Sequence, residues 1–132
     1  MFNSGSRSRS RPDTAARGRA AEDAALALLL KAGLRLLERN YRVAGGPGRP
    51  AGEVDLILRE RDGTLVFVEV RARADASAGG AAASVGPRKQ ARLIYAAQHY
   101  LQRLATPPPC RFDVIAQDGE RLAWLKAAFD AG

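Results

Sequence analysis

The chain has 132 residues, a mass of 14.1 kDa and a formal net charge of +7, which fits one domain with a hydrophobic core of its own. Its single cysteine, Cys110, and single histidine, His99, exclude an intrachain disulfide and leave no basis for a Cys/His zinc site or a Ser-His-Asp triad. No apolar run reaches membrane-spanning length and the N-terminus has no apolar signal core, so we expect a cytoplasmic protein with no membrane partner.

Positive charge is concentrated near the N-terminus, where residues 1–19 hold five arginines and one acid. Residues 1–12 are mostly Ser, Gly and Arg, which predicts a disordered basic tail followed by a single domain over residues 13–132. A basic excess favours a polyanionic partner such as nucleic acid, although a solvated basic surface without a partner would have the same composition.

A helix is expected first, because Asp13 or Thr14 can cap its start and Gly33 is a natural stop after residue 31 or 32. Glu22 precedes the leucines of this helix by helical spacings, so it belongs to the inward side. The expected apolar stripe consists of Leu26, Leu29 and Leu30.

The rest of the chain predicts strands at 34–43, 52–58 and 65–71, a helix at 88–104 led by Pro87, and strands at 111–116 and 122–125. Loops are expected at 44–51 and 74–86. The strand–helix–strand run from 66 to 116 predicts a right-handed crossover between parallel strands. The fold class is therefore α/β in the order α-β-β-β-α-β-β, with a central mixed sheet flanked by helices.

Acids interrupt the two apolar strands of the hairpin at 52–71. A three-residue loop, Arg61-Asp62-Gly63, separates the faces cleanly, since side chains alternate along a strand. One face is then aliphatic, with the pairs Leu58/Val66, Leu56/Val68 and Val54/Val70. The other face has the pairs Ile57/Phe67, Asp55/Glu69 and Glu53/Arg71, the last a structural cross-strand ion pair.

Asp55 and Glu69 form the candidate metal site. Directly opposed side chains have β-carbons about 5 Å apart, so the two carboxylates would repel each other without a cation between them. Two carboxylates with backbone oxygen and water suit a hard divalent ion, Mg²⁺ with Mn²⁺ as a substitute. The alternative is a buried salt-bridge network that uses Arg71, Arg73 and Lys89.

Other polar residues are open to two interpretations. Glu22 is either an accessory acid of the site or a favourable charge near the helix start. Lys89 and Gln90 could reach a phosphate, but a solvated state is favoured slightly. Structural roles are expected for Asp113, Trp124, Tyr100 and His99.

Several segments together resemble the YraN-like family of small bacterial proteins. They are Gly18-x-x-x-Glu22, Asn40-Tyr41-Arg42, Gly52-Glu53-Val54-Asp55-Leu56-Ile57, Val66-Phe67-Val68-Glu69-Val70-Arg71, Lys89-Gln90 and Arg111-Phe112-Asp113-Val114. That family is similar to restriction-endonuclease-like nucleases of the PD-(D/E)xK type and, within them, to archaeal Holliday-junction resolvases. The resemblance implies a restriction-endonuclease-like fold, a Mg²⁺-dependent phosphodiesterase centre, DNA as partner and, by analogy with the resolvases, a homodimer.

Carried over position by position, the resemblance makes Asp55 and Glu69 the metal carboxylates, Glu22 the accessory acid and Arg71 the residue at the usual lysine position. Arginine stays protonated and cannot act as a general base, although it can hold a phosphate by two hydrogen bonds. The candidate nucleic-acid contacts are Arg71, Arg73, Lys89 and Gln90.

Three functions therefore remain open. The first is a metal-dependent nuclease acting on DNA, including structured or branched forms. The second is a nucleic-acid-binding protein that keeps the fold without the chemistry, which the arginine at position 71 favours. The third is a protein-interaction domain with no role in nucleic-acid metabolism.

Overall fold

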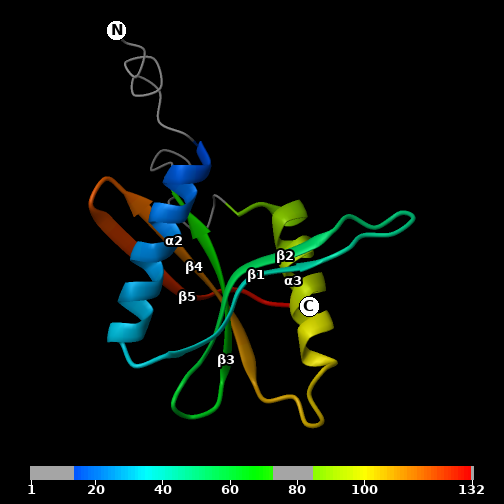
Figure 1. Ribbon diagram of the computed structural model, residues 1–132. Helices are drawn as coiled ribbons and strands as arrows, with labels where there is room; N and C mark the ends of the chain where they lie inside the picture. Colours follow the sequence, from blue (N-terminus) through cyan, green and yellow to red (C-terminus); the bar gives the residue numbers. More distant parts are fainter. Residues whose placement is uncertain (1–13, 73–84, 132) are drawn as a thin grey trace, which may run out of the picture.

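The computed structural model describes residues 14–72 and 85–131, and the element order within them is the predicted one. The predicted basic tail, Arg73 and most of the predicted loop at 74–86 lie outside these residues. The elements labelled in Figure 1 are α2 (Thr14–Lys31), β1 (Arg35–Val43), β2 (Gly52–Arg59), β3 (Leu65–Arg71), α3 (Pro87–Leu101), β4 (Cys110–Asp118) and β5 (Arg121–Phe129).

The five strands form one mixed sheet in the order β1-β2-β3-β4-β5. Strands β1, β2 and β3 are antiparallel neighbours, β4 lies parallel to β3, and β5 is antiparallel to β4. The predicted parallel pairing across α3 is therefore confirmed. Strand β3 is central, which places the acidic residues of the hairpin in the middle of the sheet rather than at its edge.

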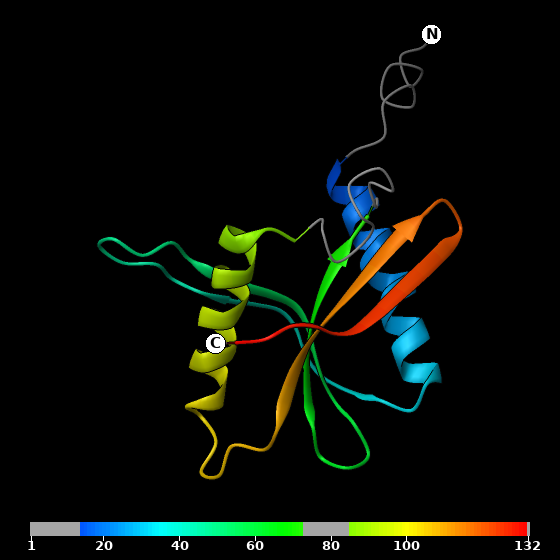
Figure 2. The same ribbon diagram turned by 180° about the vertical axis from the view of Figure 1, so that it is seen from behind.

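The two helices cover opposite faces of the sheet (Figures 1 and 2). On the α2 face, Ala25 and Leu29 pack with apolar side chains of β2, β3 and β4, and on the α3 face Leu93 and Ala97 do the same. Leu30 was expected in the α2 stripe but is 46% exposed, because the buried line runs through Ala21, Ala25 and Leu29, four residues apart. No helix in the described ranges is long and apolar enough to cross a membrane.

Helix α2 ends as the sequence predicts. Gly33 has a φ of 100°, its N–H donates to the Leu30 carbonyl, and the N–H of Leu34 donates to the Leu29 carbonyl. This is the Schellman arrangement, which favours glycine at the left-handed position.

Tyr100 is buried, and His99 Nδ1 lies 2.8 Å from the Tyr41 hydroxyl oxygen. Both residues of α3 therefore have the structural roles that the sequence predicts.

The last strand extends well beyond the predicted 122–125. It pairs with β4 from Asp118/Arg121 to Phe112/Phe129, with a bulge near the far end. Ala127 has a φ of 51° at this irregularity, and its N–H donates to the buried Asp113 carboxylate. The bulge interrupts the alternation of side chains along the strand, so the sequence pattern fades before the strand ends.

The hairpin between β2 and β3 has the predicted three-residue loop, since the N–H of Glu60 donates to the Thr64 carbonyl and Gly63 has a φ of 95°. The pairs Leu58/Val66, Ile57/Phe67 and Leu56/Val68 are confirmed.

The predicted pairs Asp55/Glu69, Val54/Val70 and Glu53/Arg71 do not form, and the ladder ends at Leu56/Val68. Val54 pairs with Tyr41 of β1 instead and packs on the α3 face, whereas Val70 packs on the α2 face. The two strands therefore separate where the acidic residues begin.

Candidate active site

The site lies in the fork where β2 leaves β3. Both ribbon views show β2 turning away from β3 together with β1 (Figures 1 and 2). Beyond the last pair, the backbone N–H of Val70 donates to Asp55 Oδ2 at 2.8 Å. A side-chain carboxylate thus takes the place of a carbonyl from the neighbouring strand, which holds Asp55 in the fork.

Asp55 is poorly suited to carry a negative charge here. Burial, followed by the charge of Glu69, raises the pKa of its carboxyl group from 3.8 to about 7, and the hydrogen bond from Val70 opposes the shift only in part. The two acids therefore interact, but not as the directly opposed pair that the hairpin register predicts, because the ladder ends before them. No ion pair to Asp55 occurs among residues 14–72 and 85–131.

Glu69 differs from Asp55 in having two cationic neighbours. Its side chain is 5% exposed, and its Oε2 atom lies 3.4 Å from Lys89 Nζ and 3.6 Å from Arg71 Nη1. Lys89 was expected to be solvated, but the first turn of α3 brings its ammonium group to the fork. The salt-bridge interpretation therefore applies to Glu69 and not to Asp55 within the described part of the chain.

Glu22 approaches the same fork from α2. Burial raises the pKa of its carboxyl group, and the nearby charge of Asp55 raises it further. Its neighbours come from β1, where Arg39 lies 3.5 Å away and the Asn40 side chain lowers the pKa of Glu22 slightly. Glu22 lies eight residues after the helix start, beyond the first turn where a helix dipole acts, so its position favours the accessory-acid interpretation.

Asn40 is a site residue to which sequence reasoning gave no role. It has a φ of 53°, which is uncommon for a residue other than glycine. It stands between the pairs Arg39/Leu56 and Tyr41/Val54, alongside Asp55. The only signal for Asn40 in the sequence is its place in the segment Asn40-Tyr41-Arg42. Its proximity to Glu22 could not be predicted, because the two residues lie on different elements, a strand and a helix.

Glu53 and Gln90 make other contacts than the sequence predicts. Glu53 is 3.5 Å from Arg92 and 3.7 Å from Arg42, and it does not pair with Arg71. Gln90 uses its amide to donate to the Val85 carbonyl at 2.9 Å, so it anchors the start of α3.

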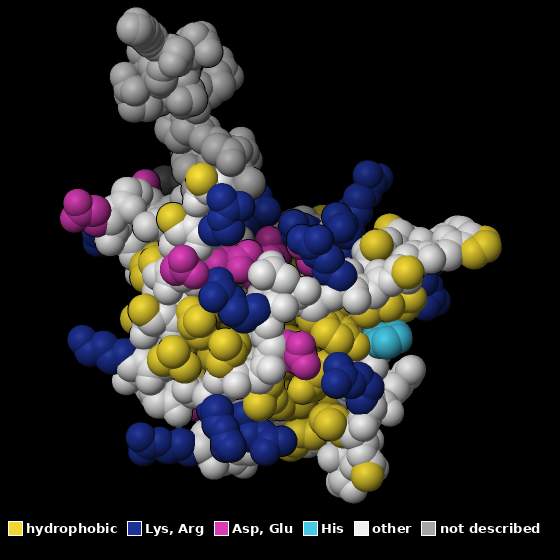
Figure 3. Space-filling view, viewed as in Figure 1, with side chains coloured by type: hydrophobic (Ala, Val, Ile, Leu, Met, Phe, Trp, Pro, Cys, Tyr) yellow, Lys and Arg dark blue, Asp and Glu magenta, His cyan; other side chains and the backbone are white. Residues whose placement is uncertain are grey.

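The surface over the fork is acidic at its centre and basic around it. Figure 3 shows acidic side chains gathered between α2 and the β1–β2 ribbon, with Lys and Arg side chains on both sides. Such a pattern suits a cation at the centre and a polyanion across the rim.

The donor set fits magnesium better than a metal that needs a closed protein cage. Within the described residues, no group of three or more His, Cys, Asp or Glu side chains is placed to hold a metal ion. Mg²⁺, however, is commonly bound through one or two carboxylates together with waters and substrate phosphates. Asp55 and Glu69 provide that number of carboxylates, and the unfavourable charge on Asp55 is what a divalent cation would relieve.

Fold and site together define a small mixed α/β domain whose central hairpin opens into an acidic fork. The chain belongs to the family described as Uncharacterised protein family UPF0102, whose model matches residues 21–116. This establishes the YraN-like resemblance at the level of the family.

Relatives of the chain cover nearly its whole length. A UPF0102 protein of Methylibium petroleiphilum is 67% identical over 118 residues, which are 89% of this chain and 97% of the relative. A UPF0102 protein of Paracidovorax citrulli is 62% identical over 119 residues, 90% of this chain and 86% of the relative. One of Cupriavidus taiwanensis is 56% identical over 120 residues, 91% and 87% of the two chains.

Proposed function

We propose that the protein is a Mg²⁺-dependent nuclease that hydrolyses phosphodiester bonds in DNA, including structured or branched forms. One observation carries the proposal: the buried carboxylate of Glu69 and the part-buried one of Asp55 meet where β2 and β3 separate, and Asp55, which has no ion pair within the described residues, has a pKa raised to about 7. An acid in this state is an incomplete site for a cation.

Each residue of the fork then has a role. Asp55 and Glu69 would hold the metal, Mg²⁺ or Mn²⁺, and Glu22 would assist through water. When bound, the metal supplies Lewis-acid polarisation of the scissile phosphate and lowers the pKa of attacking water. Arg71 and Lys89 would bind the phosphate and neutralise the negative charge that develops on it during attack.

The lysine position of related nucleases is occupied by Arg71, which cannot accept a proton. Lys89 Nζ lies 3.4 Å from the same Glu69 Oε2 atom, so the fork contains a lysine ammonium group contributed by a helix instead of a strand. This supports a phosphate-binding fork in which the two cationic roles are divided between Arg71 and Lys89.

The second candidate function is nucleic-acid binding without catalysis. It is favoured by the same ion pairs, because Lys89 and Arg71 already neutralise Glu69 and reduce its need for a metal. The two candidates differ in whether phosphodiester bonds break, not in whether DNA binds.

A plasmid-nicking assay separates them. Supercoiled DNA is incubated with the parent, Asp55→Asn and Arg71→Lys, in Mg²⁺, in Mn²⁺ and in EDTA. We expect nicking by the parent only with a divalent ion, loss of nicking in Asp55→Asn, and equal or faster nicking by Arg71→Lys. Asp118→Asn, at an exposed position at the end of β4, is the matched control and should nick like the parent. If neither the parent nor Arg71→Lys cuts any form of DNA or RNA, the nuclease proposal is wrong and the binding function remains.

A further inference from the structure

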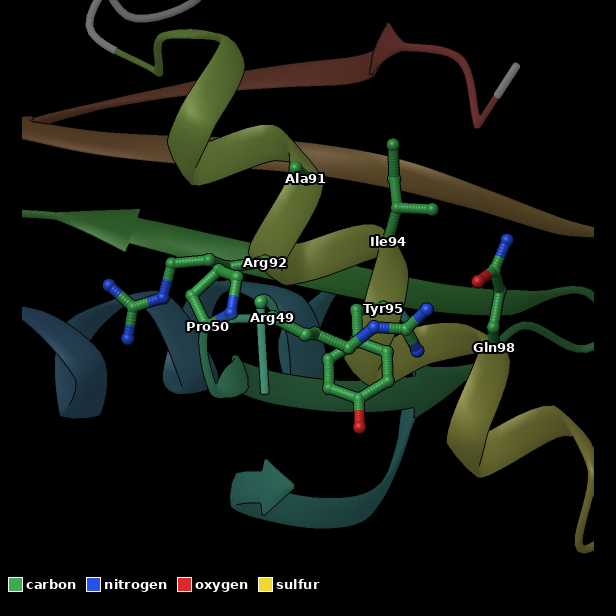
Figure 4. Close-up of a pocket in the computed structure, with 8 residues that line it drawn as sticks. Arg49, Pro50, Ala91, Arg92, Ile94, Tyr95 and Gln98 are labelled. Atoms are coloured by element: carbon green, nitrogen blue, oxygen red, sulfur yellow. The ribbon is translucent and has the colours of Figure 1, made fainter. Parts of the chain in front are cut away.

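A hollow of about 400 Å³ lies beside the fork, between the loop that joins β1 to β2 and the outer surface of α3. Figure 4 shows its walls, with Arg49 and Pro50 from the loop facing side chains of the helix. The residues that give it its chemistry are Arg49, Pro50, Arg92, Ile94, Tyr95 and Gln98. None of the residues that line the hollow is acidic.

The hollow is built into the fold, because the loop is fastened to the helix at both ends. The Tyr95 hydroxyl donates to the Ala44 carbonyl at 3.2 Å, and Arg92 Nε donates to the Ala51 carbonyl at 3.0 Å. Gly52 allows the close approach, since a Cβ there would lie 3.0 Å from the Ala96 backbone nitrogen. A pocket held in this way needs little rearrangement to receive a ligand.

The walls combine flat apolar surface with positive charge. The Arg49 guanidinium carbon lies 4.7 Å from the centre of the Tyr95 ring, so a cation and an aromatic ring are already stacked. Pro50 and Ile94 add apolar area, Arg92 adds a second cation, and the Gln98 amide can both donate and accept. An aromatic base with a phosphate attached matches this set, whereas an apolar peptide would give the Arg49 guanidinium no anionic partner. Arg92 also has Glu53 as an anionic neighbour at 3.5 Å.

The hollow is connected to the fork along α3. Arg92 also lines a second hollow of about 330 Å³ with Arg88 and Lys89, and Lys89 lies 3.4 Å from Glu69. Six residues of helix separate Lys89 from Tyr95, a rise of about 9 Å. That distance corresponds to two or three nucleotides of a stacked strand at about 3.4 Å each.

We propose that this hollow binds one unpaired nucleotide, two or three positions from the phosphate held at the fork, with its base against Tyr95 and Arg49 and its phosphate on Arg92. The proposal rests on the nucleic-acid function proposed above and narrows its substrate to DNA with an unpaired stretch beside the bound phosphate. A fully paired duplex offers no free base face to the hollow.

Binding is measured by fluorescence anisotropy on two labelled DNAs of equal length, one fully paired and one with a short central gap, in EDTA at fixed ionic strength. We expect the parent to bind the gapped DNA more tightly. Tyr95→Leu should weaken gapped binding by about fivefold to a hundredfold, the range for loss of one stacked base, and leave paired binding within twofold. Tyr95→Phe keeps the ring and should keep the preference.

Arg49→Ala and Gln98→Ala change exposed positions and should also reduce the preference, which keeps the test valid if Tyr95→Leu does not fold. Arg35→Ala removes the same charge far from the hollow and should weaken both DNAs alike. Equal binding of both DNAs by the parent overturns the inference, as does an unchanged preference in Tyr95→Leu. Asp55-dependent nicking of paired plasmid without a gap preference would overturn this inference alone, whereas a gap preference without any nicking would support it and refute only the nuclease.

Discussion

Asp55 and Asp113 are acids inside the same sheet with opposite surroundings. Asp113 is fully buried and accepts hydrogen bonds from Arg111 Nε at 3.0 Å, Trp124 Nε1 at 2.9 Å and the N–H of Ala127 at 2.9 Å. Asp55 accepts one backbone hydrogen bond and faces Glu69, Glu53 and Glu22.

The difference between their surroundings indicates that Asp113, and not Asp55, has a structural role. The donors around Asp113 come from β4 and β5, so its charge fastens the last strand at the bulge, and Arg111 is held in turn by Glu60. The neighbours of Asp55 add negative charge instead of compensating it. A fold keeps such an arrangement at a cost in stability, which is typical of sites that bind a cation or perform chemistry.

Asp113→Asn should cause the largest effect. The neutral amide leaves the part-buried Arg111 with less compensating charge, and breaking a buried ion pair of this kind costs about 3 kcal/mol of unfolding free energy. Urea denaturation should show the midpoint falling with little change in slope. A loss smaller than that of an exposed control, Asp118→Asn, would contradict the structural role of Asp113.

Asp55→Asn makes the same chemical change and should have the opposite sign. The folded-state pKa of Asp55, about 7, exceeds its ordinary value of 3.8, so the folded protein binds more protons than the unfolded chain between these values. The contribution of Asp55 to stability therefore falls as pH rises from about 4 to about 7. Without metal, the variant should be more stable than the parent by on the order of 2 kcal/mol at pH 8.

The check on this second prediction is its pH dependence. The gain should shrink as the pH falls and approach zero only below the ordinary value of 3.8, where Asp55 is protonated in both states. Destabilisation of the variant at pH 8 would mean that Asp55 is paired with a cation, as Asp113 is with Arg111.

Lys89→Gln should have the smallest effect. The Lys89 side chain is 37% exposed and Arg71 still faces Glu69, so solvent screening limits the loss to about 0.5 kcal/mol. DNA binding should fall more than stability, because the ammonium group also lies at the proposed phosphate site. Anisotropy and urea denaturation on the same preparation compare the two, and a loss of stability alone would make Lys89 purely structural.

The hairpin could be predicted as far as Leu56/Val68 because buried strands with one polar and one apolar face allow only one register. The prediction failed at Asp55, Val54 and Glu53, because β2 follows β1 away from β3 beside Asn40, whose left-handed conformation the hairpin sequence does not encode.

The candidate acids could be identified from the sequence because carboxylates are unusual in apolar strands. Their cationic partners could not be identified in the same way. Lys89 reaches Glu69 from another element through a long side chain, and alternation along a strand says nothing about such contacts. A structural role for Asp113 was expected, but two of its donors, Trp124 and Ala127, lie on β5 beside a bulge that has no clear signature in the sequence.

The most direct test is the response of thermal stability to Mg²⁺ or Mn²⁺ at pH 8, where Asp55 is ionised. A metal that binds only the folded state stabilises it by an amount that grows with the logarithm of its concentration above the dissociation constant, so the melting temperature of the parent should rise with metal concentration. Asp55→Asn should begin higher without metal and gain nothing from it. No rise in the parent, or an equal rise in both proteins, would contradict a metal site at Asp55 and Glu69.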